Sequence, residues 1–160
     1  MAMLQALKEG LPLLGLDLTD ATQRQLCAFG EAVVEQNKVM NLTAITEPRD
    51  VATLHFLDCA ALLTLTDFSG KKVIDVGTGA GFPGLPLRIL KRDFPITLLD
   101  SLNKRVDFLK SVVDELNLPK SECVHARAEE YAARHRKSLI LPPPAPWHPS
   151  PFSPNCACPL

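Results

Sequence analysis

The feature that most constrains the fold is a glycine-rich turn that directly follows an apolar, β-forming run in the middle of the chain. The run, residues 73–76, contains Asp75, and the turn, residues 77–81, leads into a helix opened by Pro83 and Pro86. Glycines let the backbone approach a ligand closely and adopt positive φ angles. The N-terminus of the following helix leaves amide donors free for a polar group. Together these features predict a nucleotide-type cofactor loop.

Two classes of cofactor fit this loop. Residues 79–84 match the dinucleotide pattern G-x-G-x-x-G, which alone would indicate an NAD-dependent oxidoreductase. In dehydrogenases the strand runs directly into the first glycine, whereas here the acid Asp75 precedes the first turn glycine, Gly77. We therefore prefer the pattern Asp-x-Gly-x-Gly-x-Gly of enzymes that use S-adenosyl-L-methionine, with Gly77 and Gly79 in the cofactor turn. A glycine-rich turn that binds no ligand is the remaining alternative.

The next predicted strand supplies a second acid. Residues 96–100 form a short apolar run that ends in Asp100, whose carboxylate can accept both hydroxyl groups of an adenosine ribose. S-adenosylmethionine and NAD both contain this ribose, so Asp100 indicates a nucleoside cofactor without distinguishing the two. Asp100 is also placed to cap a helix that begins near Asn103, and the two roles are compatible.

A third strand is predicted for residues 122–127, which places Ala128 and Glu129 at its carboxyl end. Cofactors bind at this edge of parallel sheets. We expect the two residues to flank the adenine, with a backbone amide and a side chain available to its polar edge. The alternative is the ordinary start of a helix.

The alternation of strands and helices predicts an α/β fold with a parallel sheet and right-handed crossovers. We expect an N-terminal helical region over residues 1–66 and a partial, Rossmann-like cofactor-binding domain of about three strands over residues 67–138. Residues 139–160 form a third, proline-rich segment without glycine or charged residues. That segment is either a genuine proline-rich tail or the product of a shifted reading frame, and we favour the shifted frame.

Hydrophobic spacing predicts the packing faces of the helices. Thr19 and Asp20 can cap a helix that runs to about Lys38 and carries Leu26, Phe29 and Val33 on one face. A second helix is predicted after Pro48, and a third over residues 103–117. Their expected inward residues are Val51, Leu54, Leu57 and Ala61 for the second, and Val106, Leu109, Val113 and Leu116 for the third.

Composition narrows the class of protein further. The net charge of −1 gives no electrostatic sign of nucleic-acid binding, so any RNA contact must come from local patches. Five scattered cysteines are typical of reduced thiols, and no run approaches the roughly 18 apolar residues of a membrane span. We expect a cytoplasmic protein with no membrane partner. Cys156, Cys158 and His148 match no standard zinc spacing, so we expect no metal site.

The order and spacing of these motifs resemble the bacterial ribosomal RNA small subunit methyltransferase G family, also called glucose-inhibited division protein B. The resemblance covers roughly residues 20–135, with matching segments at residues 38–45, 55–59, 73–87, 98–109 and 127–130. It implies a class I methyltransferase that uses S-adenosylmethionine to methylate N7 of a guanine, numbered 527 in the family name, in 16S rRNA or the small ribosomal subunit. It also implies cofactor contacts at Gly77, Phe82, Ala128 and Glu129. We expect the protein to be a monomer.

The implied chemistry requires no general base, because guanine N7 has an exposed lone pair and loses no proton on methylation. We therefore assign no catalytic residue, and expect positioning to supply most of the rate enhancement. His55 and Asp58 share a helix face and can contact RNA or pair with each other, although helix packing is the ordinary interpretation. Lys104 and Arg105 can bind phosphate, although exposed charge on a helix is common.

The chain departs from the family after residue 138. Family members continue with a fourth strand that ends in a Ser-Arg-Ala segment and lies beside the strand of residues 73–76. Nothing from residue 139 onward matches it, so we expect this strand to form an exposed apolar edge. A non-catalytic, C-terminally truncated remnant of the enzyme is therefore the main alternative function, and an NAD-dependent oxidoreductase is the second.

Overall fold

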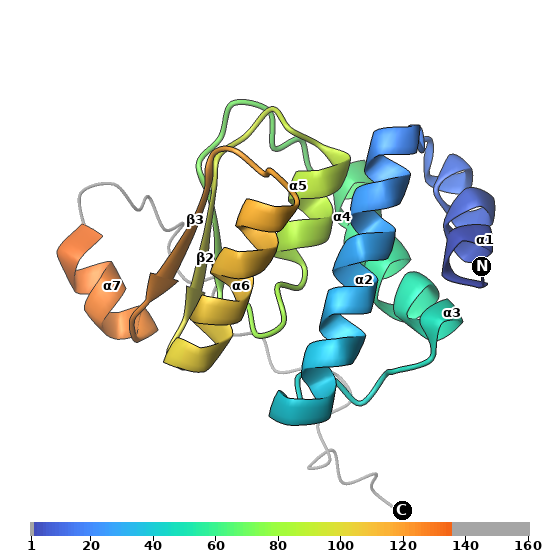
Figure 1. Ribbon diagram of the computed structural model, residues 1–160. Helices are drawn as coiled ribbons and strands as arrows, with labels where there is room; N and C mark the ends of the chain where they lie inside the picture. Colours follow the sequence, from blue (N-terminus) through green and yellow to red (C-terminus); the bar gives the residue numbers. More distant parts are fainter. Residues whose placement is uncertain (1, 136–160) are drawn as a thin grey trace, which may run out of the picture.

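The computed structural model describes residues 2–135, which form one parallel sheet and the helices around it (Figure 1). The strands are β1 (Val73–Val76), β2 (Ile96–Asp100) and β3 (Ser121–His125), in the spatial order β1-β2-β3. Val73 lies opposite Ile96 in the first pair, and Ile96 lies opposite Ser121 in the second. The expected Rossmann-like α/β fold is confirmed.

Two helices connect the strands, and a third follows the last strand. Helices α5 (Gly84–Leu90) and α6 (Asn103–Glu115) lie on one side of the sheet, and α7 (Ala128–His135) lies on the other (Figure 1). The predicted inward face of α6 is buried as expected, at Val106, Leu109, Val113 and Leu116. Because the strands are parallel, all three end at one edge of the sheet.

The N-terminal part is helical, as predicted. It contains α1 (Ala2–Gly10), the 3₁₀ helix η1 (Pro12–Leu14), α2 (Asp20–Met40), α3 (Pro48–Asp50), the π-helix η2 (Val51–Leu57) and α4 (Asp58–Leu65). The Thr19 side chain accepts a hydrogen bond from the N–H of Thr22 at 3.2 Å and caps α2. The predicted face of α2 is fully buried, at Leu26, Phe29 and Val33, and belongs to one continuous core with the sheet and α6.

The inward face predicted after Pro48 is partly wrong. Val51 is buried, but Leu54 is 58% exposed, and Leu57 and Ala61 are only partly buried. The residues that face the core are Val51, Ala52, Phe56, Cys59 and Ala60. The reason is the π-helical turn of η2, whose i→i+5 hydrogen bonds hold more residues per turn than an α-helix and shift the buried face.

Strand β1 lies at an edge of the sheet within the described residues, and the Val76 side chain is 55% exposed. This agrees with the apolar edge expected from the sequence. No helix in residues 2–135 is long and apolar enough to cross a membrane. The proline-rich segment of residues 139–160, with Cys156, Cys158 and His148, lies outside the described residues.

Candidate functional site

The loop after β1 is folded back onto β2 by backbone hydrogen bonds. The N–H groups of Gly77 and Thr78 donate to the Leu99 carbonyl at 2.8 and 3.1 Å. Gly77 and Gly79 have φ angles of +73° and +60°, a region that favours glycine. A Cβ atom at Gly77 would meet no atom within 4 Å, so this glycine borders open space. The loop therefore presents backbone at the carboxyl edge of the sheet.

Asp75 holds this loop from the inside. Its Oδ2 accepts hydrogen bonds from the Thr78 hydroxyl at 2.7 Å and from the Gly84 N–H at 2.9 Å. Burial raises the pKa of the Asp75 carboxyl, and the two hydrogen bonds oppose that rise. A Cβ atom at Gly84 would lie only 2.7 Å from the same oxygen, so this close approach requires glycine. The acid of the motif thus fixes the start of α5 against β1.

Asp100 connects the same loop to the end of β2. Its Oδ2 accepts a hydrogen bond from the Gly79 N–H at 3.0 Å, and its Oδ1 accepts one from the Leu102 N–H at 2.9 Å. Arg105 Nη1 lies 3.6 Å from Oδ2, and the Asp100 side chain is 4% exposed. A carboxylate offers about four lone-pair positions, so this one can still accept further hydrogen bonds. The residue that caps α6 by position is Leu102, and Asp100 supports that turn through its side chain.

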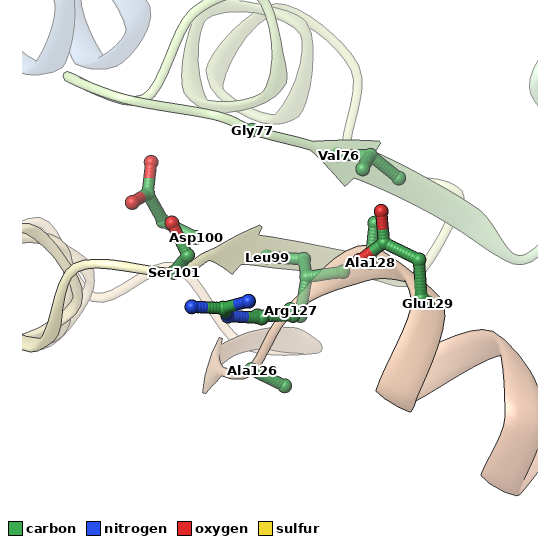
Figure 2. Close-up of a pocket in the computed structure, with 9 residues that line it drawn as sticks. All are labelled: Val76, Gly77, Leu99, Asp100, Ser101, Ala126, Arg127, Ala128 and Glu129. Atoms are coloured by element: carbon green, nitrogen blue, oxygen red, sulfur yellow. The ribbon is translucent and has the colours of Figure 1, made fainter.

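A pocket of about 400 Å³ lies where the three strands end (Figure 2). It brings together four of the residues predicted to bind cofactor: Gly77, Asp100, Ala128 and Glu129. Figure 2 shows Val76 and Gly77 on one side, and the segment from Ala126 to Glu129 on the other. Its complete lining is Val76, Gly77, Leu99, Asp100, Ser101, Ala126, Arg127, Ala128 and Glu129.

The other two predicted contacts, Gly79 and Phe82, do not line this pocket. Gly79 supports it indirectly, because its N–H is bound to Asp100. The Phe82 ring packs between the loop and the N-terminal helices, with ring centroids 5.2 Å from Phe29 and 5.8 Å from Phe56. It also stacks on the His55 ring at 4.5 Å.

Ser101 and Arg127 line the pocket but were not predicted as site residues. Ser101 follows β2 directly, and Arg127 lies two residues after β3. This position in the sequence could have indicated that both line the pocket, because the strand ends converge at one edge of the sheet. Ser101 and Arg127 are both exposed, so both side chains are accessible from solvent.

His55 lies in a polar contact with the segment that follows α2. Its Nε2 is 2.9 Å from the Thr43 hydroxyl, which also accepts a hydrogen bond from the Ile45 N–H at 3.1 Å. Burial lowers the pKa of His55, and the nearby Asp58 charge opposes that shift. The ion pairs found in residues 2–135 do not include one between these two side chains. His55 therefore joins η2 to both Thr43 and the Phe82 ring.

Within residues 2–135, no group of three or more His, Cys, Asp and Glu side chains is arranged to hold a metal ion. Cys59 is buried and Cys123 is partly buried. Both thiols are poor nucleophiles, because desolvation raises the pKa of Cys59 to about 12 and that of Cys123 to about 11. The polar groups that line the pocket are carboxylates, a guanidinium, a hydroxyl and backbone amides.

A parallel sheet whose strand ends carry a glycine loop, a buried carboxylate and a shared pocket defines the Rossmann-like class of ligand-binding proteins. Within that class, the family model "GidB: rRNA small subunit methyltransferase G" matches residues 22–141. The chain belongs to this family, as the motifs indicated.

Similar proteins agree with this assignment. The chain is 45% identical over 129 residues to the Ribosomal RNA small subunit methyltransferase G of Clostridium botulinum (strain ATCC 19397 / Type A), covering 79% of this chain and 54% of that protein. It is 46% identical over 119 residues to the protein of the same name from Desulfitobacterium hafniense (strain Y51), covering 74% and 49%. The chain thus spans about half the length of the curated relatives it matches.

Proposed function

We propose that this chain contains the cofactor-binding part of an S-adenosylmethionine-dependent methyltransferase that modifies N7 of guanine 527 in 16S rRNA. The observation that carries the proposal is that Gly77, Asp100, Ala128 and Glu129, from three successive strand ends, line one pocket. Family membership, and relatives named as small subunit rRNA methyltransferases, support the choice of reaction and substrate. The proposal assigns cofactor binding to residues 67–138, and a supporting role to the helical region of residues 1–66. It describes a cytoplasmic monomer.

The residues present fit the adenosine part of the cofactor. Asp100 has unused acceptor positions for ribose hydroxyls. Val76, Leu99 and Ala126 give the pocket an apolar lining that suits a purine face, and the first N–H groups of α7 have no partner within the helix. The open space beside Gly77 leaves room for a ligand against the backbone. In this proposal, Gly79 and Phe82 act by fixing the loop.

The proposed reaction requires the cofactor and the guanine base to be positioned, and it requires no proton transfer. S-adenosylmethionine, when bound, would supply a methyl group to the lone pair of guanine N7, with the S–CH3 bond breaking as the N7–CH3 bond forms and S-adenosylhomocysteine leaving. The residues of this chain would then have to hold the cofactor, exclude water and orient the base. Such positioning lowers the activation barrier by several kcal/mol, on the order of the advantage of a well-oriented intramolecular reaction. The proposal therefore names no catalytic acid or base.

Two alternatives are open to direct test. An NAD-dependent oxidoreductase would use the same Asp100 and glycine loop, and a non-catalytic remnant would keep the pocket without methyl transfer. Isothermal titration calorimetry of the purified chain with S-adenosylhomocysteine and, separately, with NADH distinguishes the cofactors. Binding of the first and not the second supports the proposal, and the reverse result contradicts it.

Activity is tested on small ribosomal subunits that lack the modification. Transfer of a tritiated methyl group to N7 of the target guanine supports an enzyme. Binding of S-adenosylhomocysteine without any transfer, at enzyme concentrations equal to the subunits, supports the remnant instead. A full-length family relative, assayed on the same subunits, serves as the positive control.

A further inference from the structure

A second cavity, of about 880 Å³, lies between the C-terminal end of α2 and the first turns of α6. We call this cavity the α2–α6 groove. It adjoins the cofactor pocket through the β2–α6 connection, because Ser101 lines the pocket and Leu102 lines the groove. A chain held in the groove would therefore lie beside a ligand held in the pocket.

The walls of the groove carry exposed apolar side chains. Val39 is 79% exposed and Leu102 is 52% exposed, and both line it together with Phe108. Amide side chains of Gln36 and Asn103 lie at the same surface. Exposed apolar side chains that gather beside polar ones are typical of an interaction surface.

The groove is also locally positive in a chain whose net charge is −1. Lys104 and Arg105 line it, and its one acid among the lining residues, Asp107, accepts a hydrogen bond from the Asn103 amide at 2.7 Å. Arg105 is partly engaged, with its Nη1 3.6 Å from Asp100. Lys104 is exposed at the helix surface, so its ammonium group is accessible to an anion.

We propose that the α2–α6 groove binds a single-stranded RNA segment that flanks the target base. Single-stranded RNA presents unstacked bases together with phosphates, and it matches a surface that combines apolar side chains, amides and cations. An acidic peptide would use the lysine but would gain less from Val39 and Leu102. The inference deepens the proposed function, on which it rests for the identity of the nucleic acid.

The test measures RNA binding and cofactor binding on the same preparations. The probe for RNA binding is a fluorescein-labelled single-stranded 16S rRNA fragment that contains the target guanine, followed by anisotropy over a range of salt concentrations. Calorimetry with S-adenosylhomocysteine reports on the pocket. The variants are Lys104→Glu and Val39→Ser, and the matched control is Lys110→Glu, an exposed lysine of α6 outside the groove lining.

We expect Lys104→Glu to weaken RNA binding about fivefold or more, and to reduce the salt slope by about 0.7, the value for one phosphate contact on a single strand. Val39→Ser should weaken binding about twofold to threefold, and Lys110→Glu by less than twofold. Affinity for S-adenosylhomocysteine should be unchanged in all three variants.

Several outcomes would overturn the inference. These are no RNA binding by the unaltered chain, equal losses in Lys104→Glu and Lys110→Glu, and displacement of the RNA by polyglutamate at equal charge concentration. The same measurements distinguish failure of this inference from failure of the proposed function. If S-adenosylhomocysteine does not bind, while Lys104→Glu still weakens RNA binding selectively, the groove is an RNA site and the cofactor assignment is wrong.

Discussion

Asp100 is the residue on which both the loop geometry and the proposed ribose contact depend. Its two oxygens fix Gly79 and Leu102, so the carboxylate is held in one orientation before any ligand arrives. A polar group that is already fixed loses little conformational freedom on binding, which favours affinity. Because of these hydrogen bonds, we expect substitutions at Asp100 to affect stability as well as the proposed cofactor binding.

The first prediction concerns the charge of this carboxylate. Asp100→Asn keeps the size of the side chain but replaces one acceptor oxygen with an amide NH2 donor that faces an N–H group. We expect affinity for S-adenosylhomocysteine to fall tenfold or more, since hydrogen bonds to charged groups contribute about 1.5–3 kcal/mol. Calorimetry measures this change, with Asp107→Asn on the exposed face of α6 as the matched control. Equal affinities of the two variants would show that Asp100 does not contact the ligand.

The second prediction uses the lowered pKa of His55. Below the unfolded-state pKa of about 6.5, the unfolded chain binds a proton that the folded chain resists, so folding stability falls as the pH decreases. His55→Gln keeps a polar partner for Thr43 but cannot titrate. We expect the melting temperature of the unaltered chain to decline more steeply between pH 6.5 and pH 5.5 than that of the variant. Parallel curves would indicate that His55 titrates normally in the folded protein.

At the scale of elements, α5 is held to the sheet by a buried arginine rather than by apolar contacts alone. Arg88 is 1% exposed, and its Nε donates to the Pro119 carbonyl at 3.2 Å. Its Nη1 donates to the Lys91 carbonyl at 3.2 Å, and its guanidinium lies 5.9 Å from the centre of the Phe94 ring. Through these contacts α5 is tied to the turn that precedes β3.

The third prediction follows from this arrangement. Arg88→Met fills much of the same volume but leaves the Pro119 carbonyl without its donors, so we expect a loss of about 2–3 kcal/mol in the free energy of unfolding. Urea denaturation followed by circular dichroism measures the loss. Arg92→Met, at an exposed arginine that bonds Gln25, should cost less than about 1 kcal/mol. If both variants lose the same free energy of unfolding, the buried contacts of Arg88 stabilise the fold no more than the exposed contact of Arg92.

The elements differ in how well the sequence predicts them. β1, β2 and α6 were predicted closely, because apolar runs bounded by glycine, acid and proline leave few alternatives. The sequence does not predict the buried face after Pro48 correctly, because the residues of η2 carry no pattern that distinguishes a π-turn from an α-turn. At the site, the strand ends predict that Asp100 and Ala128 lie near each other, and both line the pocket. The position of Phe82 depends instead on tertiary packing against Phe29 and His55.

At the scale of the whole molecule, the sheet is covered unevenly. Helices α5 and α6 pack on one side, with α2 on the side of α5 that faces away from the sheet (Figure 1). Strand β1 lies at an edge of the sheet within the described residues, and Val76 is exposed. An apolar edge strand presents unpaired backbone groups to other chains and promotes aggregation. The chain spans about half the length of the curated relatives it matches. We propose that the strand which the family resemblance implies beside residues 73–76 would cover this edge.

The last prediction therefore concerns a chimera. We would replace residues 136–160 with the part of the Clostridium botulinum relative that follows its aligned region. A strand paired with β1 would satisfy its free backbone groups and bury Val76. We therefore expect the melting temperature to rise by at least about 5 °C, which corresponds to roughly 2 kcal/mol in a chain of this size. Light scattering should show less aggregation. A chain of the same length ending in a Gly/Ser linker is the control. Equal melting temperatures for the chimera and the linker control would show that the edge of β1 does not limit the stability of the fold.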